Sequence, residues 1–116
     1  MKTRTALLSA AVMATGLMAG AANVRAADLD PATIAAAKTP AQHEAIAKAF
    51  EDEAAKLERE ADKHKDVSQT YAQPGGKPWM KGQVKHCDAV VKDLKAAASE
   101  DRALAAEHHK MAKQAQ

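Results

Sequence analysis

The chain has 116 residues, of which 47% are hydrophobic and 3% aromatic, so it holds one small domain and excludes a large two-domain enzyme. Three basic residues lie before residue 27, and the rest of the chain has 14 Lys and Arg against 15 Asp and Glu, which argues against nucleic-acid binding. With one Phe, one Tyr and one Trp, the predicted core is thin, and the abundance of alanine favours helices over sheets.

The first 26 residues have the features of a secretory signal peptide. Lys2 and Arg4 precede an apolar and small-residue run at 6–22, and residues 24–26 offer a cleavage site after Ala26, with Ala22 as the alternative. The run is too short and weak for a membrane span, and none is expected elsewhere. We therefore predict a protein of the bacterial periplasm, an oxidising compartment.

Residues 27–39 are predicted to form a short N-terminal helix and a linker. Asp30-Pro31 and Thr39-Pro40 each place a capping side chain before a proline, and Thr39 with Gln42 fits a capping box. The first helix is predicted to run from Pro31 to about Lys38, because Pro40 disfavours helical geometry in the residue before it.

Residues 40–116 are predicted to form an antiparallel helical hairpin. From Pro40 to Tyr71 there is no Gly or Pro, and apolar and small residues recur at steps of three and four. Residues 73–78 read Gln-Pro-Gly-Gly-Lys-Pro and predict a turn, after which a second long helix starts near residues 79–82 and continues to about Lys113.

The predicted fold class is therefore all-α: an antiparallel helical hairpin with a short N-terminal helix. A hairpin alone leaves part of its apolar stripe uncovered. Either two copies pair into a four-helix bundle, or the short first helix folds back to make a three-helix bundle, and we favour the homodimer.

Histidine and cysteine side chains are placed at matching intervals on the two long helices. His43 and His64 are 21 residues apart, as are Cys87 and His108, so each pair lies on one helix face. Facing residues of two antiparallel helices have numbers with a constant total, and this total is 151 both for His43 with His108 and for His64 with Cys87. Half of it falls within the turn, so one register is predicted to oppose both pairs.

Imidazole and thiolate groups suit copper or zinc better than calcium or magnesium. Side chains of neighbouring residues on a helix diverge by about 100°, so His86 can share a metal with Cys87, or His109 with His108, only near a frayed helix end. A second copy of the chain could supply the missing ligands of either site. Met80, Met111 and Glu60 are further donors near the two pairs. The predicted metal ligands are His43, His64, His86, Cys87, His108 and His109.

Several kinds of active site are absent from the sequence. There is no Cys-x-x-Cys-His for haem attachment, no second cysteine for a dithiol centre, and neither Glu-x-x-His nor His-Glu-x-x-His. A Cys87–His64 nucleophile lacks an evident oxyanion hole or substrate cleft on a helical hairpin. We therefore do not expect an enzyme.

The segments from Thr39 to Ala112 resemble a group of small, uncharacterised exported bacterial helical proteins. The resemblance is carried by Thr-Pro-x-x-His-Glu at residues 39–44, Pro-Gly-Gly-Lys at 74–77 and His-Cys at 86–87. The resemblance implies a two-helix hairpin and does not imply any particular activity. The chain is also similar in type to small periplasmic metal-binding helical proteins, which are richer in histidine.

Two functional hypotheses follow. In the first, the protein binds copper, or alternatively zinc, through His and Cys on the facing helix stripes, as a periplasmic chaperone or buffer. In the second, it is a structural or interaction module without a metal, in which Cys87 forms an intermolecular disulfide or stays a free thiol.

Overall fold

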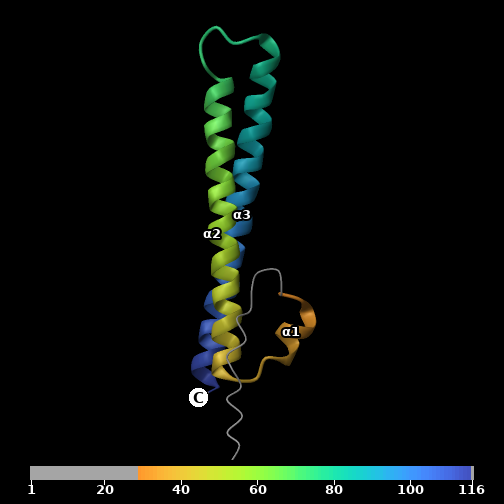
Figure 1. The fold of residues 1–116 in the computed structure, drawn as a ribbon, viewed down its shortest axis with the longest axis vertical. Coiled ribbons are helices and arrows are strands. Elements are labelled where there is room, and N and C mark those ends of the chain that lie inside the picture. The colour runs from red at the N-terminus through yellow and green to blue at the C-terminus, as the bar shows by residue number, and fades with distance from the viewer. Residues whose placement is uncertain (1–28, 116) are drawn as a thin grey trace, which may run out of the picture.

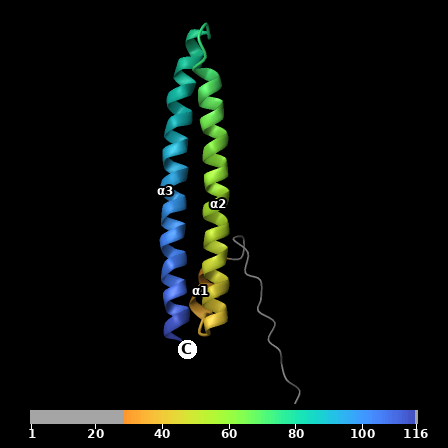
Figure 2. The same ribbon diagram turned by 90° about the vertical axis from the view of Figure 1, so that its left-hand side faces the viewer.

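The computed structural model describes residues 29–115, which form three helices and no strand. They are α1 (Pro31–Ala36), α2 (Pro40–Tyr71) and α3 (Pro78–Gln114). Helices α2 and α3 lie side by side in opposite directions, joined at one end, the closed end, by residues 72–77, and α1 lies beside the beginning of α2 at the open end (Figures 1 and 2). The all-α class is thus confirmed for these residues, and the predicted signal peptide lies outside them.

Both predicted helix starts are confirmed by their caps. The Asp30 carboxylate accepts a hydrogen bond from the Thr33 amide at 2.8 Å, and Thr39 forms the predicted capping box with Gln42. Helix α1 ends at Ala36, two residues earlier than predicted. The physical reason is that the amides of Lys38 and Thr39 donate to the Gln42 side chain at 2.8 and 3.1 Å, which commits this backbone to the cap of α2.

The connection between α2 and α3 depends on two glycines. Gly75 has a φ of +82°, which side-chain-bearing residues rarely adopt. A Cβ on Gly76 would lie 3.2 Å from the Met80 sulfur, which sits under the connection. Helix α3 begins at Pro78, one residue before the predicted start, because proline fits the first position of a helix. It ends at Gln114, one residue beyond the prediction.

The contact between α2 and α3 is a narrow seam built mainly of alanine. At 1.5 Å per residue, α2 is about 48 Å long and α3 about 56 Å. Six of the seven buried alanines repeat every seven residues, which is the period of a coiled-coil seam. They are Ala47, Ala54 and Ala61 on α2 and Ala98, Ala105 and Ala112 on α3, and the seventh is Ala49. The only large side chain that is fully buried in the described residues is Ile46, so the predicted thin core is confirmed.

One flank of the seam, here called the polar edge, carries charged and hydrogen-bonding side chains from both helices. Arg102 donates two hydrogen bonds to Glu58, at 2.7 and 3.1 Å, and Ser68 donates one to Asp88 at 2.7 Å. The polar edge consists of Glu44, Glu51 and Glu58 on α2 and Asp88, Arg102 and His109 on α3. These contacts tie the two helices together across the seam.

The opposite flank is apolar on α3. Val90, Ala97, Leu104 and Met111 recur every seven residues there, and we call them the apolar row. Val90 and Leu104 keep 37% and 45% of their surface exposed. Among residues 29–115 no helix has the length and apolar character needed to cross a bilayer.

Candidate functional site

The most distinctive polar contact in the seam joins two histidines near the open end. The Nδ1 atoms of His43 on α2 and His108 on α3 lie 3.1 Å apart, and the ring centroids 5.4 Å apart. A hydrogen bond between two Nδ1 atoms requires one of them to be unprotonated, so one ring donates and the other accepts. The contact confirms the register that places His43 opposite His108.

The histidine pair lies in apolar surroundings. Both rings are almost wholly buried, and the Phe50 ring stacks on His108 with centroids 5.9 Å apart. Burial lowers the pKa of His108, and the neighbouring His43 lowers it further. At neutral pH the His108 imidazole is therefore uncharged and has one nitrogen lone pair.

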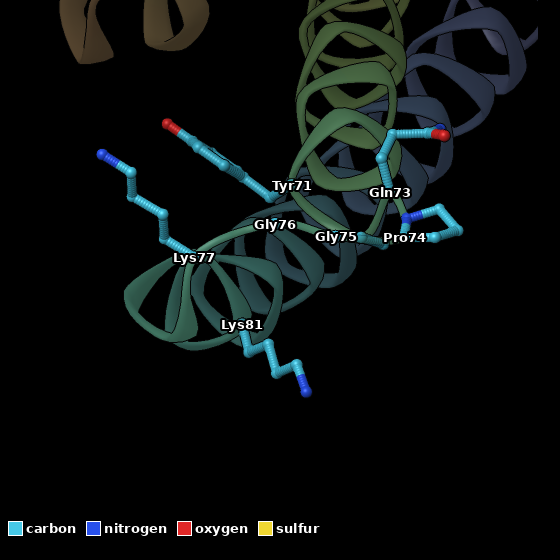
Figure 3. Close-up of a pocket in the computed structure, with 8 residues that line it drawn as sticks. Tyr71, Gln73, Pro74, Gly75, Gly76, Lys77 and Lys81 are labelled. Carbon is cyan, nitrogen blue, oxygen red and sulfur yellow. The ribbon is translucent and has the colours of Figure 1, made fainter.

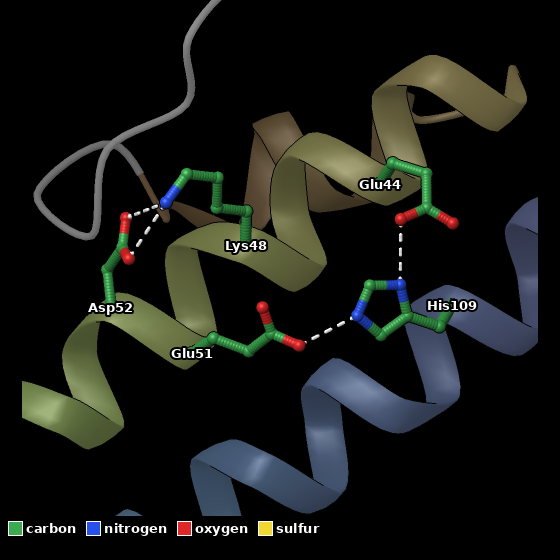
Figure 4. Close-up of polar contacts among 5 residues, drawn as sticks. All are labelled: Glu44, Lys48, Glu51, Asp52 and His109. Carbon is green, nitrogen blue, oxygen red and sulfur yellow. Dashed lines mark hydrogen bonds and ion pairs between the residues drawn. The ribbon is translucent and has the colours of Figure 1, made fainter.

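His109, the next residue, faces the polar edge instead. Its Nδ1 lies 2.7 Å from a Glu44 oxygen and its Nε2 lies 2.8 Å from a Glu51 oxygen (Figure 4). The hydrogen bond with Glu51, followed by that with Glu44, raises the pKa of His109. Both ring nitrogens are thus occupied by carboxylates, and the predicted divergence of His108 and His109 is confirmed.

The second predicted pair is not joined by a hydrogen bond in the described residues. Cys87 is a buried free thiol in the seam. His64 is half-exposed, and its Nε2 lies 3.7 Å from an oxygen of Glu60, one turn earlier on α2. His86 is exposed on α3.

Only two predicted ligands therefore make direct contact, those of the His43–His108 pair. Within residues 29–115, no group of three or more His, Cys, Asp or Glu side chains lies close enough together to hold a metal ion. A metal at the histidine pair would have two nitrogen donors, and further donors would have to come from a residue of another type, such as methionine, or from a second chain.

The double contact of His109 with Glu44 and Glu51 was not predicted, although the seven-residue spacing of these two glutamates could have indicated it. Asp101 and Glu53 occupy inner-leaning positions in the sequence, where residues usually border a narrow apolar stripe. In the structure Asp101 is half-buried in α3, and its pKa is raised by burial and by the nearby Glu53.

Comparisons of the chain with protein-family models, curated proteins and solved structures give no match. The resemblance to small exported helical proteins therefore stays a prediction. The functional proposal below is based on the geometry of the residues themselves.

Proposed function

We propose that this protein is a small periplasmic transition-metal-binding protein, a chaperone or buffer without catalytic activity. The observation that carries the proposal is the His43–His108 pair, with Nδ1 atoms 3.1 Å apart in a seam built mainly of alanine. Burying two polar rings there has a cost that their mutual hydrogen bond only partly offsets. A metal ion held between the two imidazoles would replace this hydrogen bond, with one ring nitrogen of each as a ligand.

Copper is the preferred ion and zinc the alternative. Structural zinc sites have four protein ligands, whereas the histidine pair supplies two. Met111 is one turn after His108 on α3 and is half-buried, so its thioether is the nearest additional soft donor along the helix. Imidazole together with thioether favours the softer copper ion. A zinc site would need two more ligands, which a second copy of the chain could provide.

A metal titration tests the proposal. We expect the purified protein to bind copper(I) tightly, and His43→Gln and His108→Gln each to weaken binding roughly tenfold or more. His86→Gln is the matched control, because His86 is exposed on the same chain. Circular dichroism establishes that each variant is helical. Equal copper affinity in all four proteins would refute the assignment of the site.

A second candidate is a non-metal interaction module that pairs as a four-helix bundle of two helical hairpins. The apolar row of α3 favours it, because Val90 and Leu104 remain substantially exposed beside a thin core. A homodimer would cover this row. Cys87, with 9% of its surface exposed, would have to leave the seam to form an intermolecular disulfide.

Native mass spectrometry without reductant distinguishes the two candidates. A monomer or dimer that retains copper supports the first. A metal-free dimer that becomes monomeric after Leu104→Glu supports the second, and loss of the dimer only with Cys87→Ser would indicate the crosslink. Ala103→Glu, on the exposed side of α3, is the control for the Leu104 substitution.

A further inference from the structure

The closed end of the molecule is basic, whereas the remainder is acidic. Between Asp66 and Asp88 the chain has no carboxylate side chain, whereas it has three lysines, Lys77, Lys81 and Lys85. The other described residues carry 11 Lys and Arg against 14 Asp and Glu. None of the three lysines forms an ion pair within residues 29–115, so their charges face solvent uncompensated.

The same end exposes the only tryptophan of the chain. Trp79, in the first turn of α3, keeps 58% of its surface exposed, the most of any large hydrophobic side chain described. Tyr71, the last residue of α2, contacts it edge-on with ring centroids 6.3 Å apart. The tyrosine therefore orients the indole without covering it.

Two of the three lysines lie beside the connection between α2 and α3. Lys77 and Lys81 line a pocket of about 230 Å³ there, and Figure 3 shows their side chains extending away from each other. Lys77 precedes α3 and makes no side-chain capping hydrogen bond. The partial positive charge of the α3 N-terminus therefore adds to that of the lysines.

We propose that this closed-end surface, formed by Lys77, Trp79, Lys81 and Lys85, docks on the surface of an anionic lipid membrane. Tryptophan and tyrosine prefer the boundary between headgroups and acyl chains, and lysines beside them bind lipid phosphates. Three lysines and one exposed indole near the same end of the molecule supply both attractions. The tip contacts the membrane without crossing it.

Charge complementarity also sets the orientation. The sides of the α2–α3 pair carry the acidic excess and are repelled by an anionic surface, so the molecule stands end-on. A nucleic acid would share the attraction to the lysines. Single-stranded RNA is therefore the competing ligand in the vesicle experiment, because a base can also stack on an exposed indole.

Tryptophan fluorescence tests the proposal directly, because Trp79 is the only tryptophan. The protein is purified from cells as it occurs there. It is then mixed with vesicles of phosphatidylglycerol and phosphatidylcholine, or with vesicles of phosphatidylcholine alone. We expect a blue shift of the emission with the anionic vesicles only, and co-sedimentation with them that weakens as salt is added.

Two triple variants with equal change in net charge locate the surface. Each lysine near an anionic membrane contributes about fivefold to binding, so Lys77→Gln, Lys81→Gln and Lys85→Gln together should lower the partition coefficient roughly a hundredfold. The matched control changes Lys92, Lys110 and Lys113, which are exposed elsewhere on α3, and should lower it less than about fivefold. Both triple variants have the same N-terminal residues as the unaltered protein, so the three proteins differ only at the substituted lysines.

Three results would overturn the proposal. They are an unchanged emission spectrum with anionic vesicles, equal losses of binding in the two triple variants, and tighter binding of a single-stranded RNA than of the vesicles through the same three lysines. Loss of copper binding in the histidine variants would leave the vesicle result unaffected, so the two proposals fail independently.

Discussion

Enlarging one alanine of the seam tests whether α2 and α3 are as close as the buried alanines indicate. Ala98 on α3 keeps only 1% of its surface exposed. Ala98→Leu adds three carbon atoms at this position. If the seam had room, burying them would stabilise the fold by about 2 kcal/mol, at roughly 0.8 kcal/mol per methylene. In a filled seam, the same atoms force the helices apart at a cost of about 1–3 kcal/mol.

We expect the destabilising outcome, because the alanines repeat in step on both helices and leave no gap that a leucine could enter. A cost of about 2 kcal/mol lowers the Tm of a domain this small by roughly 8–16 °C. Thermal unfolding followed by circular dichroism measures the shift. Ala96→Leu is the matched control, since Ala96 is exposed on the same helix and both substitutions have similar helix propensity.

The control should unfold within a few degrees of the natural protein. A Tm of Ala98→Leu above that of Ala96→Leu would mean that the seam has unused space, and the description of close-packed alanines would be wrong. Measuring both variants at two protein concentrations separates this effect from any change in self-association.

Three further predictions concern the connection and the histidines. Gly82→Ala should raise the free energy of unfolding by about 0.5–1 kcal/mol, since Gly82 lies inside α3 and a Cβ there would meet open space. Gly75→Ala should lower it by about 1 kcal/mol, because Gly75 has a positive φ. Urea unfolding measures both changes, and equal effects would contradict these backbone conformations. The lowered pKa of His108 means that the unfolded chain binds its proton first, so stability should fall as pH drops below the ordinary value of 6.5, and this fall should be smaller in His108→Gln. The raised pKa of His109 has the opposite effect on stability, which is fully gained below pH 6.5 and lost as the pH rises through the raised value. The loss of stability in His109→Gln should therefore be largest in acid and vanish in base. A loss that does not depend on pH would exclude the ionic contact.

Much of the fold was predictable because its determinants are local or periodic. The caps at Asp30 and Thr39 mark two helix starts through the chemistry of single side chains. The opposition of His43 and His108 follows from the heptad spacing and from the position of the turn, since a short connection leaves two antiparallel helices only one register.

Contacts between particular side chains were less predictable. A register states which residues share a layer, but it does not state which way a long side chain bends. His64 is in the layer of Cys87, yet its ring is directed to Glu60 on its own helix, because a half-exposed imidazole gains more from a carboxylate than from a thiol. His109 was predicted as a metal ligand because of its residue type, while its position on the helix places it between two glutamates.

The uniform repeat of the alanine seam has a consequence for the length of the molecule. Adding seven residues to the middle of each long helix would leave every contact type in place and move the two ends apart by about 10 Å. The histidine pair at one end and the lysine-rich tip at the other would keep their internal geometry. Selection could therefore adjust the distance from the lysine-rich tip to the histidine pair in fixed increments without redesigning either end.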